Sequence, residues 1–216
     1  MRIEDVDYAQ SANTFLAVFL GAFLATIGGV VAGHFEAGSR KKERERHAAL
    51  LIGEVLTTLQ TLLRLAGETR GIGDPYGPIT MRMLRAARRE IEVYDRNRET
   101  LYEINSPVLR SGVHTLVLRI NMPLESVIDV SDEIRDLTQA LKARDVTEAE
   151  RVDLEEALAL RTERRDVGFD FVIETAAEIP GVVAQLGALA GHRFARYRGN
   201  AVGVLPQGQA VVSDEA

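Results

Sequence analysis

Cysteine is absent from this chain of 216 residues, and its absence removes several classes of chemistry at once. Without a thiol there is no disulfide framework, thiolate zinc site, iron–sulfur cluster or cysteine nucleophile. An excess of positive charge is also lacking, because the formal net charge is −6. Bulk electrostatics therefore argue against nucleic acid as a partner.

Catalytic and metal-binding motifs are also missing. The chain has four histidines, at positions 34, 47, 114 and 192, so no two are spaced to bind a metal from one helix face. No Gly-x-Ser-x-Gly sequence is present, and the many carboxylates are interleaved with arginines, as on solvated helix faces. We expect no metal, no cofactor and no enzymatic activity.

Charged side chains are missing from residues 8–35, where no Asp, Glu, Lys or Arg occurs. About 20 apolar residues in a helix cross a hydrocarbon core of roughly 30 Å. A buried helix of a soluble domain would be apolar along one stripe only, and a cleaved signal peptide would carry a basic amino-terminal region. Neither pattern is present, so the sequence predicts an uncleaved transmembrane helix over residues 14–35.

The charges that flank this segment predict its orientation. Basic residues follow it within a short, densely charged linker over residues 36–46, whereas the preceding residues 1–13 carry more acidic than basic side chains. The positive-inside rule then places residues 1–13 outside the cell and the large carboxyl-terminal part in the cytoplasm of a bacterial inner membrane. The basic residues expected at the membrane surface, where they contact lipid, are Arg40, Lys41, Lys42 and Arg44.

One face of the predicted membrane helix carries only small residues. They recur every four positions, and such rows let two helices approach closely in lipid. We interpret this face as a packing surface against a second copy of the chain or another membrane subunit; the alternative is a lone anchor whose small residues recur by chance. The row consists of Ala17, Gly21, Ala25, Gly29 and Gly33.

The rest of the chain has helical periodicity. Apolar residues recur at steps of three and four over residues 47–66, 80–97, 107–143 and 147–198, and no segment alternates with period two. Ser106 and Thr147 are expected to cap the third and fourth of these helices. The fold class is therefore all-α, with an antiparallel bundle of about four helices over residues 47–198 and a flexible tail over residues 199–216.

Two prolines and two segments within the bundle leave alternatives open. Pro123 and Pro180 lie inside helical patterns, and each is expected to kink or divide its helix. Residues 179–191 are uncharged and form a buried helix, an oligomer interface or an element that touches the membrane. Residues 94–105 either pack a turn between two helices or contact a ligand or partner.

The layout resembles that of bacterial proteins of uncharacterised function with one amino-terminal membrane helix, a basic linker and a small cytoplasmic helical domain. The resemblance rests on FLAVFLGAFLATIGGVVAG, on RKKERERHAALLIGEVL and on the Tyr-Asp-x-Asn sequence at 94–97. It implies an architecture but no activity. We expect a structural protein that assembles with itself or with a larger membrane complex; the alternative is a signalling or effector module that senses a ligand or partner.

Overall fold

All the secondary structure that we observe is helical. The computed structural model describes residues 4–143 and 147–194, and within residues 4–37 it describes side chains at positions 19–22 and 24 only. The predicted tail at 199–216 lies outside this range. No strand occurs among the described residues, whose elements are α1 (Glu4–Arg70), α2 (Pro78–Arg96), the 3-10 helix η1 (Arg98–Glu103), α3 (Pro107–Leu141), α4 (Glu148–Ala176) and α5 (Ile179–Ala190).

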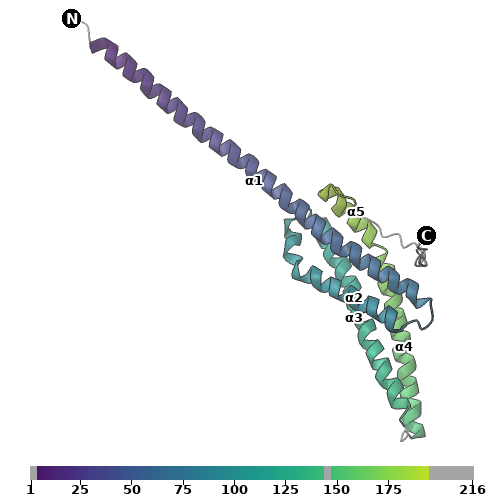
Figure 1. The fold of residues 1–216 in the computed structure, drawn as a ribbon. Helices are drawn as coiled ribbons and strands as arrows, with labels where there is room; N and C mark the ends of the chain where they lie inside the picture. The colour runs from purple at the N-terminus through teal and green to yellow at the C-terminus, as the bar shows by residue number, and fades with distance from the viewer. Residues whose placement is uncertain (1–3, 144–146, 195–216) are drawn as a thin grey trace, which may run out of the picture.

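Helix α1 is a single unbroken helix of 67 residues, and its amino-terminal half projects far from the other helices (Figure 1). At 1.5 Å per residue its length is about 100 Å. A bend is expected from the sequence at Gly38 and Ser39, but the helix continues through both. One glycine costs a helix only about 1 kcal/mol, and the strong helix formers of the charged segment that follows offset this cost.

The carboxyl-terminal half of α1 organises the bundle, because it packs against α2, α5, η1 and α4. Its predicted apolar stripe is buried, and the stripes of α2 and the first half of α3 are buried with it. This confirms the helical periodicity as the source of the core. The fully buried large side chains include Leu56, Leu59, Leu63, Leu84, Ile91, Ile120 and Leu124.

The expected count of about four helices is not confirmed, because the described chain holds six helical elements. The sequence pattern predicts one interrupted helix over residues 147–198, whereas in the structure α4 ends at Ala176 and α5 is a separate helix. Pro180 lies in the first turn of α5, where its missing N–H leaves no bond unmade. Pro123 lies inside α3, which continues as one helix on both sides of it.

Helices α3 and α4 extend beyond the bundle as a two-helix arm (Figure 1). No described residue between positions 131 and 168 is fully buried. The predicted stripe residues Ile134, Leu137 and Leu141 are therefore only partly buried, because no third helix covers this part of the hairpin. The periodicity correctly identifies the helix but cannot show how many neighbours each of its turns will have.

Helix α5 ends earlier than the sequence suggests. The expected helix continues to residue 198, but Gly191 adopts a left-handed conformation with a φ of 61° and the His192 N–H donates to the carbonyl oxygen of Gly187 at 3.0 Å. This is the usual glycine termination of a helix. Since α5 packs on α1 and buries Ile179 and Leu186, the buried-helix interpretation of this segment is the one that the structure supports.

Both predicted amino-terminal caps are present. The Ser106 hydroxyl accepts a hydrogen bond from the Leu109 N–H at 3.3 Å, and Pro107 follows in the first helical turn. Thr147 and Glu150 form a reciprocal capping box at the start of α4.

Replacing Ser106 with alanine is expected to destabilise the bundle by about 1 kcal/mol, because one N–H of the first turn of α3 loses its acceptor. Urea unfolding of the full chain in mild detergent, followed by circular dichroism, measures this change. The matched control is Ser111→Ala, since Ser111 is exposed in the next turn of α3. Equal effects of the two substitutions would contradict the capping role.

One helical segment among the described residues, Gly38–Arg70, is long and apolar enough to cross a membrane. In the most apolar 18-residue window of this segment, 44% of the residues are buried within the protein. The buried positions include Leu56 and Leu63, which are core residues of the bundle. The segment predicted to cross the membrane, residues 14–35, belongs to the same helix, but most of its side chains lie outside the described residues.

Candidate functional site

The end of the bundle from which α1 projects is held together by polar contacts between α1 and the turn before α3. The backbone N–H of Asn105 donates to Glu45 Oε1 at 2.8 Å, and Asn105 Nδ2 donates to Glu45 Oε2 at 2.6 Å. Arg44 Nε lies 3.7 Å from Glu103 Oε2 on η1. These contacts fix the projecting helix to the bundle about one turn before Ala48, the first buried residue among the described side chains of α1.

The predicted basic membrane-surface residues therefore divide into two groups. Arg44 contacts the bundle through Glu103, whereas Arg40, Lys41 and Lys42 are exposed on the projecting part of α1.

A cavity of about 320 Å³ lies at this same end, between η1 and the start of α3. Tyr102 is 72% exposed at its rim. Arg110 Nη1 donates to the backbone oxygen of Tyr102 at 3.3 Å, and its guanidinium lies 5.9 Å from the centre of the Tyr102 ring. The side chains that give the cavity its polar character are Arg98, Tyr102, Arg110, Ser111 and His114.

The cluster at 94–105 thus has two parts. Tyr94 and Leu101 are buried, and Asn97 Nδ2 donates to the backbone oxygen of Val93 at 2.8 Å, so these residues pack the turn between α2 and α3. The Tyr94 hydroxyl lies 3.4 Å from His114 Nδ1. Tyr102 instead faces solvent and remains accessible to a ligand.

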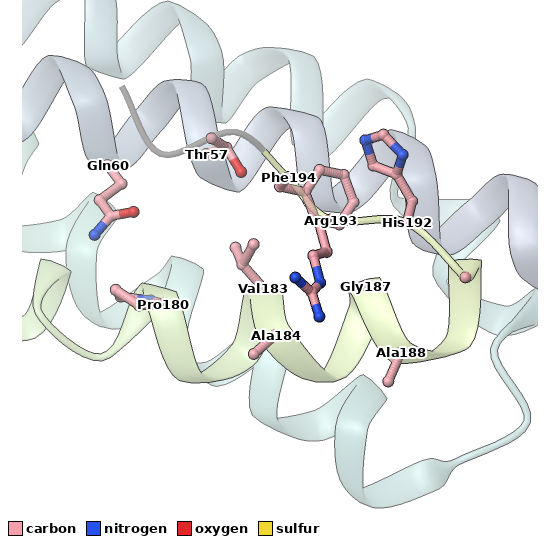
Figure 2. Close-up of a pocket in the computed structure, with 11 residues that line it drawn as sticks. Thr57, Gln60, Pro180, Val183, Ala184, Gly187, Ala188, His192, Arg193 and Phe194 are labelled. Atoms are coloured by element: carbon pink, nitrogen blue, oxygen red, sulfur yellow. The ribbon is translucent and has the colours of Figure 1, made fainter. Parts of the chain in front are cut away.

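Where α1 and α5 pack together, residues of both helices line a groove of about 620 Å³, and Phe194 closes one side of it (Figure 2). Two glycines make this packing possible. A Cβ atom at Gly53 would lie 2.1 Å from the Phe194 ring, and one at Gly187 would lie 2.6 Å from the carbonyl oxygen of His192. The sequence does not predict this contact; its one local signal is a glycine inside each of two otherwise regular helices.

At the opposite end of α1, a polar and aromatic cluster joins the α1–α2 loop to α4. The Tyr76 hydroxyl donates to Asp166 Oδ1 at 2.5 Å, and Arg70 pairs with Asp166 and Asp170. The Arg165 guanidinium lies 3.6 Å from the centre of the Tyr76 ring. Burial and the bond to Asp166 raise the pKa of Tyr76. These contacts close the loop onto α4, and we interpret them as structural.

The predicted packing face of the membrane segment lies entirely on α1. Among its five small residues, Gly21 is the one whose surroundings are described, and a Cβ atom at this position would have no other atom within 4 Å. The side chains of Ala17, Ala25, Gly29 and Gly33 lie outside the described residues. No group of three potential metal-binding His, Asp or Glu side chains occurs in the part of the chain that the structure describes.

Comparison of the chain with protein-family models, with curated proteins and with solved structures gave no match. A functional proposal therefore rests on the geometry of this molecule.

Proposed function

We propose that this protein is a membrane-anchored structural module of the bacterial inner membrane. In this proposal residues 14–35 cross the bilayer with the amino terminus outside, and the helical bundle stands at the cytoplasmic face. The transmembrane helix binds a second copy of the chain or another membrane subunit, and the bundle holds or recruits a partner. The role needs no cofactor and no catalysis.

The observation that carries this proposal is the projecting part of α1. Among the described side chains of α1, the first that is buried belongs to Ala48, and the helix begins about 40 residues, or roughly 60 Å, before it. Large apolar side chains on this part are open to the surroundings: Phe19 is 65% exposed, Leu20 54% and Leu24 61%. Lipid is the environment that favours such side chains on an isolated helix, and the length exceeds the roughly 30 Å of a bilayer core.

The unbroken course of α1 supports a second candidate, the signalling or effector module. Leu56, Leu59 and Leu63 belong to the same helix as the membrane segment and lie in the centre of the core. A movement of the membrane segment would therefore reach the bundle without passing through a flexible linker. Scaffold and sensor differ in assembly: a scaffold forms a permanent complex of fixed stoichiometry, whereas a sensor changes the exposure of α1 when stimulated.

Replacing both Gly21 and Gly29 with leucine is expected to dissociate the membrane assembly, weakening it at least tenfold, because the larger side chains keep the helices apart. Sedimentation in detergent and native mass spectrometry of the extracted chain measure this. The space around Gly21 within one chain is open, so leucine there should not disturb the fold itself. The matched control is Phe19→Leu, because position 19 lies on the opposite side of the helix from Gly21. Unchanged sedimentation of the double variant would refute the packing face.

A further inference from the structure

The charged side chains that line the cavity between η1 and α3 are all basic. Two of the residues that line it are arginines and none is a carboxylate. Within residues 38–143 and 147–194, neither Arg98 nor Arg110 pairs with an acidic side chain, whereas Arg44, Arg88 and Arg119 each do. The carboxylate of Glu103 on η1 is turned to Arg44 of α1. Two arginines therefore line one cavity, and no carboxylate lines it with them.

The other polar groups of the cavity suit an anion with several oxygen atoms. Ser111 contributes a hydroxyl and His114 a ring nitrogen, so the lining offers hydrogen-bond donors beside the two arginines. Guanidinium groups bind phosphate oxygens in pairs, and this bidentate geometry makes arginine the common choice at phosphate sites. The first turn of α3 lies beside the cavity, and its helix dipole adds positive potential.

The position of the cavity favours a membrane lipid as the source of the anion. Asn105 lies between η1 and α3 and binds Glu45, so the cavity lies at the end of the bundle from which α1 projects. Ten helical residues separate positions 35 and 45, which is about 15 Å. The headgroup layer occupies roughly 5–8 Å of that distance. Tilting of α1 by about 20° brings one side of the bundle closer still.

Two exposed apolar residues mark the same end of the bundle. Tyr102 is 72% exposed and Val108 is 82% exposed, on either side of the turn that binds Glu45. A tyrosine with a polar tip and an apolar ring is the residue type that proteins place at membrane–water interfaces. We propose that this cavity binds the phosphate group of an anionic lipid, with Arg98 and Arg110 as its charged ligands. The inference rests on the proposed membrane anchor. It adds that binding of a lipid phosphate would hold this end of the bundle at the membrane surface.

The chain contains no tryptophan, which makes a direct test possible. The full chain carrying Tyr102→Trp is placed in lipid nanodiscs of phosphatidylcholine with a minor fraction of phosphatidic acid, in which one or the other lipid is brominated to quench the indole. We expect brominated phosphatidic acid to quench Trp fluorescence at least twofold more than the same fraction of brominated phosphatidylcholine. Adding Arg98→Gln and Arg110→Gln should abolish the difference.

Two further single-tryptophan variants separate this inference from the proposed function. Phe19→Trp reports the membrane segment and should be quenched by either lipid, whereas Phe171→Trp, on the outer face of α4, should be quenched by neither. Quenching at position 19 but not at 102 overturns the phosphate site and leaves the anchor intact; no quenching at 19 overturns the anchor. Binding of inorganic phosphate that needs both arginines, without preferential quenching by phosphatidic acid, overturns the lipid assignment.

Discussion

Replacing Leu56 with aspartate is expected to unfold the helical bundle while leaving the chain in the membrane. Leu56 is fully buried in the carboxyl-terminal half of α1. Removing a buried leucine side chain costs about 2–5 kcal/mol, and a buried carboxylate without a partner adds several more. Domains of this size are stable by only about 5–15 kcal/mol, so the sum is enough to unfold the bundle. Limited proteolysis and circular dichroism in nanodiscs measure the fold, and membrane fractionation measures attachment.

The matched substitution is Leu24→Asp, because Leu24 lies near the middle of residues 14–35. An aspartate at the centre of a membrane helix opposes insertion by about 3 kcal/mol relative to leucine. We expect this variant to leave the membrane fraction and to keep a protease-resistant bundle. The opposite pattern, with Leu56→Asp releasing the chain and Leu24→Asp leaving it attached, would assign the membrane crossing to Gly38–Arg70, the segment that hydropathy selects among the described residues.

The features that the sequence predicts correctly are those that depend on residues close together in the chain. The stripe of Leu56, Leu59 and Leu63 is buried because its spacing places all three on one helix face. Ser106 caps α3 through a hydrogen bond to a residue three positions later. Both patterns are complete within a few turns of helix, so no knowledge of the rest of the fold is needed to predict them.

The features that the sequence does not predict depend on which turns of different helices contact each other. The contact between Phe194 and Gly53 joins positions 141 residues apart, and the local signal is only a glycine in a helix. Leu141 has the same spacing as the core leucines but is only partly buried, because α3 extends beyond α1 and α2 at this point. That Arg98 and Arg110 line the same cavity likewise cannot be predicted without knowing the turn between η1 and α3.

Alkaline solution should destabilise the bundle between pH 10 and 12 because of a buried tyrosine. Tyr94 is only 2% exposed, and burial, together with the nearby charge of Asp95, raises its pKa to about 12. In the unfolded chain a tyrosine has a pKa near 10. Between these values the unfolded state loses the proton and the folded state keeps it, so stability falls as the pH rises. A pKa difference of about two units corresponds to roughly 3 kcal/mol. The raised pKa of Tyr76 contributes in the same direction.

Urea unfolding of the full chain at a series of pH values from 9 to 12 measures this slope. Tyr94→Phe should flatten it by about half, because Tyr76 still contributes, whereas Tyr102→Phe, at an exposed position, should leave it unchanged. A slope in Tyr94→Phe as steep as that of the unmodified chain would mean that the Tyr94 hydroxyl ionises without unfolding the core. The turn between α2 and η1 would then have to open to water in the folded state.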